Sequence, residues 1–171
     1  MIGAIKIMSG IVEKLRESGK IILSIAVCQA AGMIGSYFTR PAIPNWYATL
    51  AKPSFTPPDW VFAPAWIMLY ILMGISFYLV WRRGWTDYQV KKALIIFLIQ
   101  LGLNAFWSVA FFGLRSPLAG MIVIVALWVA ILQTMIGFSR LSRGAVLLLV
   151  PYICWVSFAA WLNFSILRLN S

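Results

Sequence analysis

Three apolar stretches of this sequence carry aromatic and amide side chains at helical spacing, and these side chains are the ones that could recognise a ligand. Within each stretch they recur every three or four residues, so on a helix they would share one face. The stripes are Phe62, Trp66, Tyr70, Met73 and Phe77; Gln100, Asn104, Trp107 and Phe111; and Trp155, Ala159, Leu162 and Ile166, with Asn163 beside the last. Helix–helix packing alone also produces stripes of this kind.

The amide side chains in and beside these stripes suggest a role beyond helix–helix packing. Gln100, Asn104 and Asn163 are costly to leave in hydrocarbon. We therefore expect them to face the interior of a helix bundle, where hydrogen-bond partners exist. An interior with flat aromatic walls and a few amides suits a large, flat, mostly apolar ligand.

Catalytic groups are scarce in the sequence. It holds no His, and none of its four acidic residues lies in the middle of an apolar stretch, which argues against metal ligation by imidazole and against a proton relay. Cys28 and Cys154 lie within apolar runs and are predicted to be small buried side chains rather than a disulfide or metal site. Ser108 and Ser157 are predicted to serve helix packing. We expect no acid–base or nucleophilic catalytic residues and no metal site.

The amino-acid composition predicts the kind of secondary structure that carries these residues. Of the 171 residues, 63% are hydrophobic and 11% are charged, whereas soluble domains carry about 25% charged residues. A core of this size could not remove so much apolar surface from water, so lipid must be the solvent. The length allows roughly five spans of about 20–25 residues. We predict an all-α integral membrane protein with one five-transmembrane-helix bundle.

The spans are separated by short polar intervals. They are predicted at about residues 21–38, 59–81, 88–113, 118–138 and 145–167, within a transmembrane domain of residues 21–171. Residues 1–20 mix apolar and charged side chains, which predicts an amphipathic N-terminal extension at the membrane interface that ends at Ser18-Gly19. Residues 46–60, which we call the proline loop, hold three prolines and cannot continue a helix. We expect a stiff loop there, between the first two helices.

Charge predicts the orientation in the membrane. The net charge is +10, but the basic residues lie between apolar runs rather than along one face, so we expect no nucleic-acid partner. Only four of them fall on the side of the proline loop: Arg40, Lys52, Arg115 and Arg168. Because basic residues concentrate on the cytoplasmic side, the N-terminus is predicted there, with the proline loop and the C-terminus on the opposite side.

Several motifs in combination resemble one family. The proline loop reads Trp46-Tyr47, then Lys52-Pro53-x-Phe55-x-Pro57-Pro58, and the next span continues Trp60-Val61-x-x-Pro64-x-Trp66. Later spans contain Gln100-Leu101-x-Leu103-Asn104-x-x-Trp107 and Pro151-Tyr152-x-x-Trp155-x-x-Phe158-Ala159-x-x-Leu162-Asn163. Together, over about residues 28–170, they resemble the translocator protein family, also called the tryptophan-rich sensory protein or peripheral-type benzodiazepine receptor family.

The resemblance implies a fold and a ligand. Members are five-helix membrane bundles, usually homodimers, that bind porphyrins such as protoporphyrin IX, sterols and benzodiazepine-type ligands in a pocket under the loop between helices 1 and 2. No other cofactor is implied. Trp66 and Trp155 would flank a porphyrin by stacking, Gln100 and Asn104 would offer polar contacts, and Lys52, if it turns inward, would meet a propionate. The expected ligand-binding residues are Trp46, Lys52, Phe62, Trp66, Tyr70, Gln100, Asn104, Trp107, Phe111, Trp155, Ala159 and Leu162.

The function implied is a membrane sensor or regulator of tetrapyrrole or stress responses, and two alternatives stay open. One is a light-dependent porphyrin-degrading enzyme, in which Trp66 and Trp155 would be redox partners of the excited porphyrin. The other is a porphyrin or sterol transporter, although the sequence shows no evident repeats and no charge within a span. Two departures from the family pattern are Phe55, where Trp is usual, and Phe164, where the sterol motif needs Tyr.

Overall fold

The computed structural model describes residues 2–171, and the side chains of residues 8–171. Within that range the chain forms five long helices, each apolar enough to cross a membrane, which confirms the predicted five-helix bundle. The helices are α1 (Ile2–Asn45), α2 (Asp59–Trp81), α3 (Tyr88–Ser108), α4 (Pro117–Ser139) and α5 (Arg143–Leu169). Two short elements join them: the 3₁₀ turn η1 (Tyr47–Thr49) and the π-helical turn η2 (Val109–Gly113), which continues α3.

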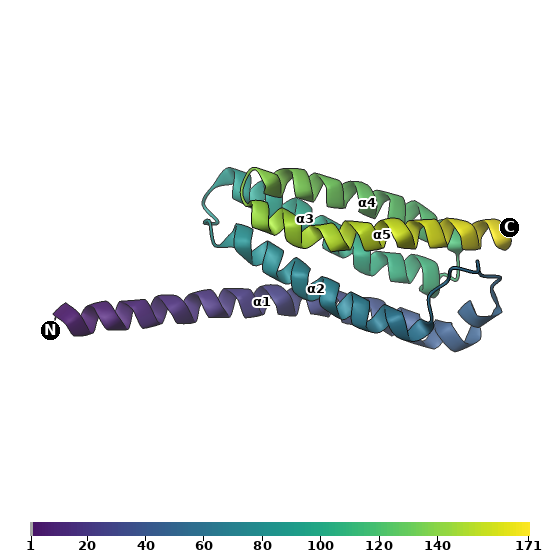
Figure 1. The fold of residues 1–171 in the computed structure, drawn as a ribbon, viewed down its shortest axis with the longest axis horizontal. Coiled ribbons are helices and arrows are strands. Elements are labelled where there is room, and N and C mark those ends of the chain that lie inside the picture. The colour runs from purple at the N-terminus through teal and green to yellow at the C-terminus, as the bar shows by residue number, and fades with distance from the viewer. Residues whose placement is uncertain (1) are drawn as a thin grey trace.

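The helices run up and down along one axis (Figure 1). α1 packs on α2 and α3, α4 packs on α3 and α5, and α2 packs on α5. The N-terminal part of α1 projects beyond the bundle, while the C-terminus lies at the opposite end, beside the loop that joins α1 to α2 (Figure 1). The proline loop and the end of α5 therefore meet at one end of the molecule.

The first helix differs most from the prediction. It runs without a break through Ser18-Gly19 and ends at Asn45 rather than near residue 38, so both predicted ends were wrong. A single glycine within a helix costs only about 1 kcal/mol relative to alanine, so Gly19 need not end the helix. Pro41 and Pro44 lie in the last turns of the helix, where each removes one N–H donor to the carbonyl four residues earlier and little helix follows.

The N-terminal extension is described in part. Met8 and Leu15 are exposed and lie on the same helix as the charged residues Glu13 and Lys14. The side chains of residues 1–7 lie outside the described residues. The location of this segment at the membrane interface stays a prediction.

Serine and aspartate side chains begin three of the helices. Asp87 accepts a hydrogen bond from the backbone N–H of Gln89 at α3, Ser116 from Ala119 at α4, and Ser142 from Ala145 at α5. Such caps satisfy N–H groups that the first helical turn leaves without partners. The caps therefore allow the turns between helices to be short.

The half of the bundle away from the proline loop is tightly packed. Its core includes the fully buried side chains of Met73, Leu94, Phe97 and Phe138. A Cβ atom added at Gly74 on α2 would lie 2.6 Å from the Cα of Ile25 on α1, so the absence of a side chain lets these two helices touch.

Candidate ligand-binding site

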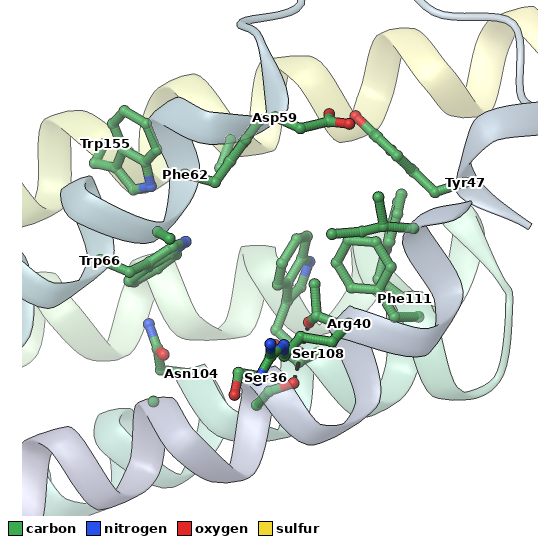
Figure 2. A pocket seen from close by; sticks show the side chains of 18 of the residues that line it. Ser36, Arg40, Tyr47, Asp59, Phe62, Trp66, Asn104, Ser108, Phe111 and Trp155 are labelled. Carbon is green, nitrogen blue, oxygen red and sulfur yellow. Dashed lines mark hydrogen bonds between the residues drawn. The ribbon is translucent and has the colours of Figure 1, made fainter. Parts of the chain in front are cut away.

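A cavity of about 540 Å³ lies inside the half of the bundle nearer the proline loop (Figure 2). Residues of α1, α2, α3, η2 and α5 line it, together with Tyr47 of η1. Its volume is within the usual range for small-molecule sites, about 300–1,000 Å³. Met33 and Ile67 line the cavity and are nevertheless 66% and 55% exposed, so its wall is incomplete between α1 and α2.

Most of the residues expected to bind a ligand line this cavity. They come from α2, from α3 with η2, and from α5, because each stripe follows the helical period and faces the same space. The members are Phe62, Trp66, Tyr70, Asn104, Trp107, Phe111, Trp155, Ala159 and Leu162.

Three expected residues are not among those that line it. Trp46 packs edge-on against Phe111, with ring centres 5.4 Å apart. Gln100 is buried deeper, with its amide oxygen 2.9 Å from the Tyr152 hydroxyl. Lys52 stays within the loop: its ammonium lies 4.7 Å from the ring centre of Tyr47 and 3.4 Å from the carbonyl oxygens of Ala48 and Leu50.

The tryptophans form a corner. The rings of Trp66 and Trp155 stand at 84° with centres 6.4 Å apart, and Trp66 stacks on Tyr70 at 5.5 Å. A flat ligand that is parallel to one of the two indoles must be perpendicular to the other. The expected stacking on both tryptophans at once therefore does not fit this arrangement, which offers one face and one edge.

A chain of buried hydrogen bonds forms the floor of the cavity. The hydroxyl of Tyr70 donates to the Asn104 amide oxygen, the Asn104 amide nitrogen donates to the Tyr152 hydroxyl at 2.9 Å, and Tyr152 donates to Gln100 at 2.9 Å. Asn163 is also buried, and its side chain bonds to Trp107 Nε1 at 3.3 Å and to the Pro117 carbonyl at 2.8 Å. As predicted, the three amides face the interior, and their partners hold them there.

One donor faces the cavity without a partner. Among the described side chains, Trp155 Nε1 and Gln100 Nε2 are the buried polar atoms that lack a hydrogen bond. Trp155 lines the cavity, and its indole nitrogen points toward the interior (Figure 2). Leaving a buried donor unpaired costs about 1–3 kcal/mol, which an acceptor on a bound ligand would recover.

The proline loop closes one end of the cavity. Tyr47 is 6% exposed and packs with Phe111, Leu162 and Ile166. Burial raises the pKa of Tyr47 to about 12, and the nearby carboxylate of Asp59 adds to this, so its hydroxyl stays neutral at physiological pH.

Hydrogen bonds from the end of α5 hold the proline loop in place. The amide of Asn170 both accepts from the N–H of Ala51 and donates to the carbonyl of Ala51, each at 2.9 Å. Phe55 lies against Phe158, with ring centres 6.4 Å apart.

Sequence reasoning missed the polar residues of the cavity wall. Ser36, Arg40, Asp59 and Ser108 all line it (Figure 2). A first span that ends near residue 38 places Arg40 in a loop, whereas α1 continues to Asn45 and carries Arg40 along the cavity. The spacing of Ser36 and Arg40, four residues apart on one helical face, is the signal that could have revealed them.

Comparison with known proteins agrees with this architecture. The model of the TspO/MBR family matches residues 24–169. The chain is 51% identical over 150 residues to the tryptophan-rich protein TspO of Chlorobaculum tepidum, which covers 88% of this chain and 95% of that one. It is 47% identical to the protein of the same name from Archaeoglobus fulgidus (89% and 97% covered), and 37% identical to the translocator protein of Homo sapiens (80% and 82% covered). The chain belongs to the TspO/MBR family of multi-pass integral membrane proteins.

Proposed function

We propose that this protein binds a porphyrin such as protoporphyrin IX in the cavity and acts as a sensor or regulator of tetrapyrrole or stress responses. The observation that carries the proposal is the corner of Trp66 and Trp155, with an unpartnered indole N–H, in a cavity of about 540 Å³. A flat conjugated ring would stack on one indole and meet the other at its edge. The resemblance of the motifs to porphyrin-binding relatives supports the choice of ligand.

The cavity favours binding over acid–base chemistry. Its floor is a chain of hydrogen bonds among Tyr70, Asn104, Tyr152 and Gln100, which holds these side chains in place. Such a floor positions a ligand without reacting with it. A sensor also needs a response to occupancy, and the proline loop, held to α5 by Asn170, is the element that would transmit it.

We further propose an orientation and an assembly. The excess of Lys and Arg at the end that holds the N-terminus and the α2–α3 and α4–α5 turns supports a cytoplasmic N-terminus. The proline loop, the cavity and the C-terminus would then lie toward the opposite side. A homodimer is proposed from the family resemblance.

A titration with protoporphyrin IX tests the ligand. We expect saturable quenching of tryptophan fluorescence in the purified protein, weakened about tenfold or more by Trp66→Ala and by Trp155→Ala because each change removes an aromatic wall. Trp155→Phe keeps a ring but removes the N–H, so binding should weaken by about two- to tenfold, the value of one hydrogen bond. Trp161→Phe, on the exposed face of α5, is the matched control and should bind as the parent protein does.

The affinities of the variants, compared with one another, test whether this cavity is the porphyrin site. Equal affinity of the Trp66, Trp155 and Trp161 variants would rule out this cavity as the porphyrin site. Absence of saturable binding by the parent protein would rule out the proposed ligand.

A further inference from the structure

Arg40 is a solvent-exposed basic residue that lines the cavity. It lies on α1, one turn beyond Ser36, and lines the cavity. In the described part of the chain its guanidinium makes no ion pair or hydrogen bond. A guanidinium has five N–H donors in a planar fork that matches the two oxygens of a carboxylate.

A second donor without a partner lines the same cavity. Ser108 lines the cavity where α3 passes into η2, and among the described residues its hydroxyl has no hydrogen-bond partner. The approach of α1 and α3 is tight at this point, since a Cβ added at Gly35 would lie 2.9 Å from Ser108 Oγ. In the view of Figure 2, the labelled side chains of Arg40, Ser36 and Ser108 lie on the side of the cavity opposite Asp59 and Phe62.

The neighbouring hydroxyls are already engaged. Ser36 donates to the carbonyl of Met33 at 3.1 Å, and Thr39 donates to the carbonyl of Gly35 at 3.0 Å. The donors available to a ligand on this wall are therefore the Arg40 guanidinium and the Ser108 hydroxyl. We call this pair the Arg40 corner.

The opposite side of the cavity mouth repels acids. Asp59 lies there with Tyr47, across from Arg40 (Figure 2). Lys52, the other basic residue near the mouth, is held by the Tyr47 ring and by backbone carbonyls. An acidic group on a ligand thus meets attraction on the α1 wall and repulsion on the α2 wall, which fixes the direction in which it must point.

We propose that the Arg40 corner binds a carboxylate of the ligand and makes the cavity select acidic over neutral flat molecules. The inference rests on the proposed function and refines it, because it names the feature that distinguishes one flat apolar ligand from another. The apolar ring would lie against the tryptophan corner and its acidic edge would face α1. Charge-assisted hydrogen bonds of this type are stronger than neutral ones, particularly beside apolar walls.

The experiment compares protoporphyrin IX with its dimethyl ester, which has the same ring and no carboxylate. Affinities of both probes are measured by fluorescence quenching for the parent protein, Arg40→Gln, Arg40→Lys and Lys52→Gln. Arg40→Gln should weaken binding of the diacid by about tenfold and leave the ester unchanged, since only the diacid loses a charged contact. Arg40→Lys keeps the charge but loses the planar guanidinium, so its affinity for the diacid should lie between those of the parent protein and Arg40→Gln.

Lys52→Gln is the matched control. It removes the same charge from the same end of the molecule, at a side chain that the structure turns toward the loop backbone. It should change the diacid affinity by less than twofold. Retained binding of the ester by each variant shows that the variant is folded.

Each alternative result has a separate meaning. An equal loss for diacid and ester in Arg40→Gln, or no loss for either, overturns the Arg40 corner while the porphyrin site stands. An equal effect of Lys52→Gln and Arg40→Gln on the diacid also overturns it, because general attraction at the membrane surface would then suffice. Failure of the parent protein to bind either probe overturns the proposed function itself.

Discussion

Tyr152 connects the polar residues beneath the cavity. Its side chain is fully buried on α5, and its hydroxyl accepts from Asn104 on α3 and donates to Gln100 on the same helix. Its ring also lies 6.4 Å from that of Trp66, one wall of the tryptophan corner. One residue therefore bonds to two amides and supports a wall of the site.

Removing that hydroxyl should destabilise the protein. In Tyr152→Phe the ring stays, while Asn104 and Gln100 each lose a partner in a place that water cannot easily reach. We expect the free energy of unfolding to fall by about 1–3 kcal/mol, seen as a lower melting temperature in detergent. Tyr37→Phe, at a side chain that is 76% exposed, is the control and should melt with the parent protein. Equal melting of the two variants would show that the network contributes nothing to stability.

The proline loop is held in place by two attachments to the helix bundle. Its prolines restrict the conformations open to it, and Tyr47 anchors its first turn in the cluster around Phe111. Two hydrogen bonds to Asn170 then hold its middle to the end of α5. The loop is thus a stiff cover with two attachments rather than a flexible linker.

Breaking one attachment should loosen the cover without unfolding the bundle. Asn170→Ala removes both hydrogen bonds to Ala51, each of which is worth about 1 kcal/mol. We expect faster hydrogen exchange at the amides of residues 50–56 and unchanged exchange in α3 and α4. Ser171→Ala is the control, because that hydroxyl bonds only to the Arg168 carbonyl, away from the loop. Identical exchange in the two variants would mean that Asn170 does not hold the loop.

The whole molecule has two unlike ends. One holds the projecting start of α1 and the α2–α3 and α4–α5 turns, and the other holds the cavity, the proline loop and the C-terminus (Figure 1). Basic residues are concentrated at the first end. Because such residues stay on the cytoplasmic side during insertion, this asymmetry sets the proposed orientation of the cavity.

Labelling with a membrane-impermeant maleimide tests that orientation. With Cys28 and Cys154 replaced by Ala, we expect Ser54→Cys in the proline loop to react in intact cells. Thr86→Cys, in the turn between α2 and α3, should react only after the membrane is opened. The reverse pattern would place the cavity mouth toward the cytoplasm and refute the proposal.

Local features of the sequence were sufficient for much of this architecture. The five helices follow from the length and apolarity of their stretches, and the face that each stripe presents follows from the helical period. Nine of the twelve expected site residues line the cavity for that reason, and the three buried amides face inward because hydrocarbon offers them no partners.

The remaining features of the site depend on contacts between helices and could not be predicted from local sequence. The sequence by itself determined which residues each helix turns inward, since that property belongs to a single element. Only the tertiary structure decided that Trp66 and Trp155 meet at 84°, and that Arg40 rather than Lys52 lines the cavity. The physical reason is that ring angles depend on how α2 and α5 pack, and that the part of α1 facing the cavity depends on how α1 packs against α2 and α3.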